Sequence, residues 1–157
     1  MKRNKWWTYG IFIGLTLAVG MLSGFLTKEG MAQVSQLPQS ALTPPSWVFP
    51  VVWSILYTLM AIGAAKIWMS PESEERSRGL WLYLFQLIFN FFWSLFYFNM
   101  QAFGFSLLWL IALWILILLM ILSWRKTDKL AAWLPIPYLI WVAFAGYLNF
   151  VMWRLNG

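Results

Sequence analysis

Long apolar segments separated by short polar segments make up most of this chain. A helix that crosses a bilayer needs about 20 consecutive, mostly apolar residues, and five segments meet this requirement. They run over about residues 6–26, 47–69, 80–100, 103–124 and 130–153. We therefore predict an all-α integral membrane protein, in which residues 1–157 form a single domain, a bundle of five transmembrane helices. The 27–46 connection is the longest, and it is polar and contains prolines.

The basic residues lie at the ends of the apolar segments and mostly on one side of the predicted bundle. Nine of the 11 fall on the N-terminal side, namely Lys2, Arg3, Lys5, Lys66, Arg76, Arg78, Arg125, Lys126 and Lys129, whereas Lys28 and Arg154 fall on the other. Because positively charged loops stay in the cytoplasm, we expect a cytoplasmic N-terminus, an external C-terminus and a location in a bacterial cell membrane.

The first apolar segment has a second interpretation, because the basic residues 1–5 precede it as in a secretory signal peptide. We expect a retained span instead. The apolar run is longer than a typical signal core and lacks a good small-residue cleavage site. If this span is retained, the number of helices is odd, and the basic residues then fall mainly on one side of the membrane.

Composition narrows the chemistry that the spans can support. Hydrophobic residues make up 62% of the chain and the mean hydropathy is +0.70, yet Cys and His are both absent. The sequence therefore lacks disulfides, the commonest metal ligands and the usual axial ligand of haem. Without carboxylates in the predicted spans, ordinary acid–base or nucleophilic catalysis has no residues to use. We expect no metal site, no required cofactor and, without a continuous basic face, no nucleic-acid binding.

Aromatic, amide and small side chains recur at spacings of three and four in three of the spans, so each set shares one helix face. The three sets are Pro50, Trp53, Tyr57 and Ala61; Gln86, Asn90, Trp93 and Tyr97; and Tyr138, Trp141, Ala145, Leu148 and Asn149. Because polar side chains within a span avoid lipid, we expect the three faces to converge inside the bundle.

The 13 tryptophans divide by depth. Seven lie near span ends, where indoles form interfacial belts, and we assign them to those belts: Trp6, Trp7, Trp47, Trp68, Trp124, Trp133 and Trp153. Trp53, Trp93 and Trp141 lie deeper, in a pocket for an aromatic ligand or in ordinary helix packing. Asn90, Asn99 and Asn149 likewise fit either a pocket or hydrogen bonding between helices.

Three motifs resemble one known family. Residues 44–57 read PPSWVFPVVWSILY, residues 90–93 read NFFW, and residues 137–149 read PYLIWVAFAGYLN. They are similar to the second-, third- and fifth-helix motifs of the translocator protein/tryptophan-rich sensory protein family. The resemblance covers all five spans in order.

The resemblance implies a five-helix bundle, usually a homodimer, that binds porphyrins and takes part in their sensing, transport or removal. Animal members also bind cholesterol and synthetic drugs of the isoquinoline-carboxamide and benzodiazepine type, and bacterial members are linked to light-dependent porphyrin degradation. It assigns ligand binding to Trp53, Tyr57, Asn90, Trp93, Trp141, Ala145 and Leu148. We expect Trp53 and Trp141 to be the photochemical residues if the porphyrin is degraded.

Two departures from the family pattern change what we expect of the ligand. Phe150 stands where the family's sterol-recognition stretch has tyrosine, which weakens the case for sterol binding, although that pattern is a weak indicator even when intact. Residues 31–38 lack the tryptophan-tyrosine pair and the lysine of many members. A lid formed by the first connection would therefore contact the ligand differently.

Three classes of function remain open from the sequence. The first is a porphyrin-binding protein, and the second is an enzyme that degrades porphyrin in the light. The third is a structural or regulatory membrane partner that acts through a dimer face. Its candidate face is the small-residue stripe of the first span, which fits packing inside the bundle equally well: Gly10, Gly14, Ala18 and Leu22. Ion-coupled transport is disfavoured because the spans contain almost no ionisable residue.

Overall fold

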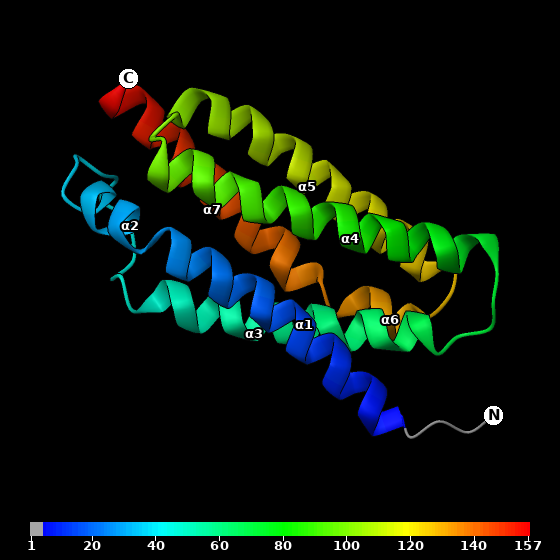
Figure 1. The fold of residues 1–157 in the computed structure, drawn as a ribbon. Coiled ribbons are helices and arrows are strands. Elements are labelled where there is room, and N and C mark those ends of the chain that lie inside the picture. Colours follow the sequence, from blue (N-terminus) through cyan, green and yellow to red (C-terminus); the bar gives the residue numbers. More distant parts are fainter. Residues whose placement is uncertain (1–4) are drawn as a thin grey trace.

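The computed structural model describes residues 5–157, so Lys2 and Arg3 of the predicted basic N-terminus lie outside the described residues. The described part consists of helices joined by short connections (Figure 1). In chain order these are α1 (Lys5–Leu26), α2 (Lys28–Val34), α3 (Val48–Trp68), α4 (Glu74–Ser94), the π-helix η1 (Leu95–Asn99), α5 (Phe103–Arg125), α6 (Lys129–Trp133) and α7 (Ile136–Asn156). Within residues 5–157, five helical segments are long and apolar enough to cross a membrane, which confirms the predicted fold class.

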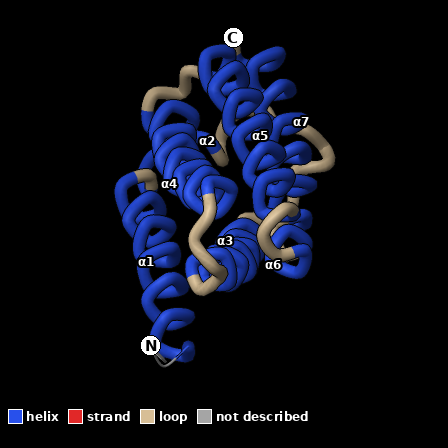
Figure 2. The backbone as a smooth tube through the Cα atoms, turned by 90° about the vertical axis from the view of Figure 1, so that its right-hand side faces the viewer, coloured by secondary structure: helices blue, strands red, loops and turns tan. Residues whose placement is uncertain are grey.

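The long helices pack side by side in a bundle (Figure 1, Figure 2). Helix α1 packs on α3, α4 packs on α5, and α5 packs on α7. Helices α3 and α7 touch each other much less extensively than these pairs do. The seam between α3 and α7 is therefore a place where side chains, and not close backbone packing, fill the space between two helices.

Helix α1 has its polar residues inside and its apolar residues outside. The buried residues of α1 are Thr8, Thr16 and Ser23, and the Thr16 hydroxyl is hydrogen-bonded to the hydroxyl of Tyr83 on α4. Apart from Lys5 at its start and Ala18, its exposed side chains are large and apolar, namely Trp6, Trp7, Ile11, Leu15, Met21, Leu22, Phe25 and Leu26. A helix in water has the opposite arrangement, so lipid is the environment that fits this surface.

Helix α4 begins at Glu74, whereas the expected span began at about residue 80. The Ser73 side chain caps the helix by accepting a hydrogen bond from the Arg76 backbone N–H at 3.1 Å. Glu74 and Glu75 lie in the first turn, where negative charge is favourable next to the helix dipole. The helix therefore extends beyond its apolar segment, because hydropathy marks what lipid covers and capping marks where the helix starts.

The last apolar segment, expected as one helix over residues 130–153, is divided into α6 and α7. The break falls at Leu134 and Pro135, and Pro135 has no N–H with which to continue a helix. Helix α6 begins at the side chain of Asp128, which accepts hydrogen bonds from the backbone N–H groups of Leu130 (3.0 Å) and Ala131 (3.2 Å).

The long connection over residues 27–46 contains a short helix that was not expected from the sequence, α2. Gly30 of α2 lies so close to η1 that a Cβ there would be 2.5 Å from the Phe98 carbonyl oxygen. The rest of the connection is tied to α7. The Ser40 hydroxyl lies 3.2 Å from the Tyr147 hydroxyl, and the Asn156 side chain donates to the Pro38 carbonyl at 3.1 Å.

Trp124 corrects the assignment of seven tryptophans to interfacial belts. The other six are 40–70% exposed, as a belt requires, but Trp124 is fully buried. Its indole lies between Gly63 of α3 and Gly79 of α4, where a Cβ on either glycine would come within 2.6 Å of the ring. Its Nε1 donates a hydrogen bond to the Gly79 carbonyl at 3.0 Å. Two glycines on neighbouring helices thus admit the ring into the bundle.

Candidate functional site

Aromatic side chains from α3 and α7 meet at the seam between these helices. The Trp53 ring lies 5.7 Å from Tyr57, 6.1 Å from Tyr138 and 6.3 Å from Trp141, measured between ring centroids, in edge-to-face geometry. Tyr57 in turn lies 6.4 Å from Tyr138. We call these four residues the seam cluster. It brings together Trp53, Tyr57 and Trp141 of the seven expected ligand-binding residues.

A buried network of polar side chains continues from the seam cluster into the bundle. The Tyr138 hydroxyl donates to Gln86 Oε1 at 2.7 Å and accepts a hydrogen bond from Asn90 Nδ2 at 2.6 Å. Gln86 Nε2 donates to the Tyr83 carbonyl at 2.9 Å. Asn90, expected as a ligand contact, is therefore engaged with Tyr138, and a ligand would have to compete for its amide.

Trp93, another expected ligand contact, belongs to a second group of contacts that joins three helices. Its Nε1 donates to Asn149 Oδ1 on α7 at 3.1 Å, and Asn149 Nδ2 donates to the Phe103 carbonyl at the start of α5 at 2.8 Å. The Trp93 ring stacks on Tyr97 at 5.0 Å. Trp93 and Asn149 are thus hydrogen-bonded to each other. Of the two roles expected for Asn149, a pocket residue or a hydrogen bond between helices, this contact is the second.

Trp141 differs from Trp93 in one decisive respect. Its indole Nε1 is buried and has no hydrogen-bond acceptor, one of three such side-chain atoms among residues 5–157. The ring itself is only partly buried, as is that of Trp53. Unpartnered polar atoms are rare in protein interiors because each costs about 1–3 kcal/mol. The seam cluster therefore offers a hydrogen-bond donor beside two ring systems.

The remaining expected residues, Ala145 and Leu148, lie buried on α7 beyond Trp141. Ala145 is one helical turn from Trp141, and its side chain is a single methyl group. Two residues of the site were absent from the expected set. Phe49, one turn before Trp53, contacts Trp141 at 5.9 Å, and its spacing on the same helix was a signal for it.

Gly20 of α1 is the other missed residue, and no pattern in the sequence points to it. A Cβ at Gly20 would lie 2.6 Å from the Tyr57 ring. The absence of a side chain there lets Tyr57 lie between α1 and Tyr138. Glycine at this position therefore helps to set the depth of the seam cluster.

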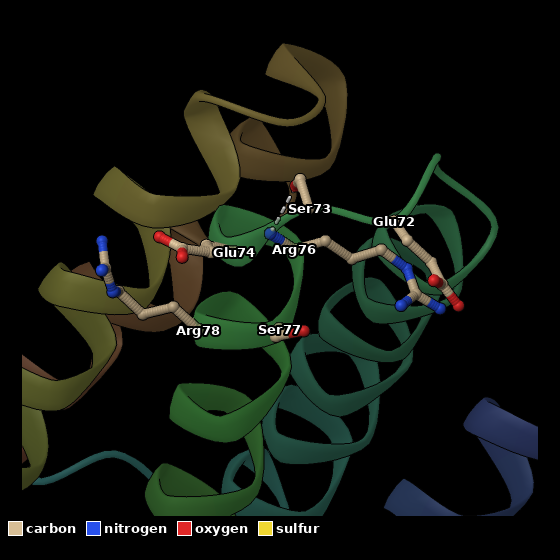
Figure 3. Close-up of a pocket in the computed structure, with 6 residues that line it drawn as sticks. All are labelled: Glu72, Ser73, Glu74, Arg76, Ser77 and Arg78. Carbon is tan, nitrogen blue, oxygen red and sulfur yellow. Dashed lines mark hydrogen bonds between the residues drawn. The ribbon is translucent and has the colours of Figure 1, made fainter.

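Two surface hollows lie away from the seam cluster, and none of the seven expected residues lines either one. The first lies at the start of α4 (Figure 3). There Glu72 and Arg76 extend to one side and Glu74 and Arg78 to the other. Charges of both signs alternate around this hollow, so it offers no strong potential for one kind of ion. The second is lined by Phe25, Leu26, Lys28, Glu29, Gly30, Gln33 and Asn99.

Comparison with known proteins identifies the family. The model of the TspO/MBR family matches residues 12–154. The tryptophan-rich protein TspO of Chlorobaculum tepidum is 38% identical over 95% of this chain and 96% of its own length. The translocator protein of Homo sapiens is 33% identical over 92% of this chain and 89% of its own. The tryptophan-rich sensory protein of Cereibacter sphaeroides is 34% identical, over 72% and 70% respectively.

The match and the architecture agree over the whole bundle. The matched region begins within α1 and ends within α7, so it includes every helix that contributes to the seam cluster. The relatives align over 70–96% of their own length. This multi-pass membrane protein belongs to the TspO/MBR family.

Proposed function

We propose that this protein binds porphyrins from the membrane at the seam cluster, and that it serves their sensing, transport or removal. The observation that carries the proposal is the buried, unpartnered Nε1 of Trp141 beside the ring of Trp53. A flat macrocycle with acceptor atoms would supply the missing partner and cover both rings. Synthetic aromatic ligands with a carbonyl acceptor fit the same requirement.

The chemistry of the cluster favours flat, largely apolar ligands. Offset stacking on an indole adds about 0.5–1.5 kcal/mol beyond burial of area, and the rings of Trp53 and Trp141 are both only partly buried. The small side chain of Ala145 lies one helical turn from Trp141. Porphyrin propionates would need cations, and Lys28 and Arg154 are the candidates on the C-terminal side of the bundle. Recognition thus rests on the ring faces more than on the charged edge.

Substitution of Trp141 tests this placement. We expect Trp141→Phe to weaken protoporphyrin binding by about tenfold, because it keeps a ring and removes the N–H, and a hydrogen bond contributes about 1 kcal/mol or more. Trp141→Ala should weaken binding further, because the stacking surface is also lost. The measurement is a titration of purified protein with protoporphyrin in the dark, followed by the porphyrin absorption band.

Trp133→Phe is the matched control, because Trp133 is 68% exposed on α6 and should leave the affinity unchanged. Equal affinities for the native protein and both Trp141 variants would show that porphyrin does not bind at the seam cluster.

Light-dependent degradation of porphyrin is the second candidate function. The close edge-to-face approach of Trp53 and Trp141, at 6.3 Å, favours it. An excited porphyrin can pass an electron to molecular oxygen, which becomes superoxide, and the adjacent indoles can exchange an electron with the porphyrin radical cation that remains. Illumination of the saturated complex should then bleach the porphyrin band. We expect Trp53→Phe to abolish bleaching and to retain binding. Bleaching at the native rate in this variant would leave a binding protein.

A further inference from the structure

Cations and aromatic rings gather where the first turns of α1 meet the last turn of α3. The Lys66 Nζ atom lies 5.9 Å from the centroid of the Tyr9 ring, and the Lys5 Nζ atom lies 5.4 Å from the Trp6 ring. The rings of Trp6 and Tyr9 are themselves 6.0 Å apart. The two lysines, from two different helices, therefore share one aromatic surface, which we call the α1/α3 cation cluster.

In the described part of the chain, no carboxylate forms an ion pair with either lysine of this cluster. Within residues 5–157, the ion pairs join Glu75 to Arg78 at 2.8 Å and to Lys126 at 3.8 Å. Lys5 and Lys66 lie outside both pairs. Cation–π contacts leave the full positive charge of each ammonium available to an anion. The cluster is thus a site of uncompensated positive charge at the end of two packed helices.

Arg76 reduces the electrostatic repulsion that the carbonyl end of α3 would exert on an anion at the cluster. The last carbonyls of a helix carry partial negative charge, and Trp68 supplies one of them at the end of α3. Arg76 covers that oxygen, donating from Nε at 3.2 Å and from Nη2 at 2.8 Å. Arg76 also lines the hollow at the start of α4 together with Glu72 (Figure 3). We therefore assign Arg76 to the Trp68 carbonyl, and the two lysines to the anion.

The surroundings of the cluster indicate an amphipathic partner. Trp6 and Trp68 are 70% and 52% exposed, as expected for indoles at the level of lipid headgroups. From this end, the half-buried apolar side chains Ile13 and Leu17, four and eight residues after Tyr9, continue along the same side of α1. An anion with an apolar chain would place its charge at the lysines and its chain along the helix, whereas a soluble anion would use only the first contact.

We propose that the α1/α3 cation cluster binds the phosphate headgroup of an anionic phospholipid, with Lys66 and Lys5 as the cationic contacts. Tyr9 and Trp6 fix the ammonium groups in place and line the floor of the site. The site is separate from the seam cluster, because it lies at the outer side of the α1–α3 contact and uses none of the expected porphyrin-binding residues. Its lipid would help hold α1, which buries few side chains, against α3.

Native mass spectrometry of the full-length protein tests this assignment. The detergent-solubilised protein is mixed with equal amounts of phosphatidylglycerol and phosphatidylcholine. It is then released from the detergent in the mass spectrometer, and the ratio of the two lipid adducts is measured. We expect the native protein to prefer phosphatidylglycerol. Lys66→Gln should reduce this preference about fivefold, since one lysine near a membrane surface contributes about that factor. Lys66→Arg should retain it, because the charge is kept.

Lys129→Gln is the matched control, since Lys129 is exposed at the same end of the bundle but on α6. Its preference for phosphatidylglycerol should stay close to that of the native protein. Three results would overturn the proposal: no preference in the native protein, an equal loss in Lys129→Gln, or release of the lipid by millimolar inorganic phosphate. The last result would mark the cluster as a site for a soluble anion.

Discussion

Trp124→Ala should lower the free energy of unfolding by about 3–5 kcal/mol, the range found when a large buried aromatic side chain is removed. Trp124 is fully buried, and its ring fills the slot between Gly63 and Gly79. Neither glycine can move a side chain into the space, so the cavity cannot close without a shift of α3, α4 or α5. The variant also leaves the Gly79 carbonyl without the indole donor.

The measurement is reversible unfolding in mixed detergent micelles, followed by circular dichroism. Trp124→Phe should cost less than Trp124→Ala, because most of the volume remains and only the hydrogen bond and part of the ring are lost. Trp133→Ala is the control, since this indole is 68% exposed and its removal leaves no cavity. Equal stabilities of Trp124→Ala and Trp133→Ala would contradict a packing role for Trp124.

Asn149→Leu should lower the free energy of unfolding by about 2 kcal/mol and leave porphyrin affinity within about twofold. The substitution is close in volume, but it removes the acceptor of the Trp93 Nε1 bond and the donor to the Phe103 carbonyl. The Trp93 N–H would stay buried without an acceptor, whereas the Phe103 carbonyl, in the first turn of α5, would keep its helical hydrogen bond. Hydrogen bonds between membrane helices contribute about 0.6 kcal/mol on average, so most of the cost comes from the unsatisfied indole N–H.

A double-mutant cycle with Trp93→Phe isolates this contact. Trp93→Phe removes the N–H, so adding it to Asn149→Leu should cost less than the sum of the two single variants. Asn156→Leu serves as the control on the same helix, because Asn156 is only half-buried, near the end of α7, and water can replace its bond to Pro38. Strict additivity would mean that Trp93 and Asn149 do not stabilise each other, and a large loss of porphyrin affinity would return Trp93 to the ligand site.

The architecture follows from the sequence because bilayer thickness imposes a length on each apolar segment. Helical periodicity also has a fixed value, so the sharing of one face by Trp53 and Tyr57, or by Trp141 and Ala145, could be read from spacing alone. Helix capping explains the one span whose start was predicted wrongly. The span beginning at Glu74 was placed late, because Ser73 and two glutamates begin the helix in a segment that hydropathy treats as a loop.

The sequence also predicted how far along a span each tryptophan lies, but not whether its ring faces the inside or the outside of the bundle. Position near a span end placed Trp6 and Trp133 correctly at the surface and placed Trp124 wrongly there. All three residues lie near an end of an apolar segment. What separates them is the presence of Gly63 and Gly79 on two other helices, opposite Trp124. A tryptophan can enter the bundle only where its neighbours leave a slot, and those neighbours are distant in the chain.

The same distinction runs through the site. The sequence by itself determined which residue types each helix carries and which of them share a face, since the helix repeat depends only on local backbone geometry. Only the tertiary structure decided that Trp93 is satisfied by Asn149, that Gly20 admits Tyr57, and that the Nε1 of Trp141 has no partner. Those outcomes depend on the distance and rotation of one helix against another, which are set by packing between residues far apart in the chain.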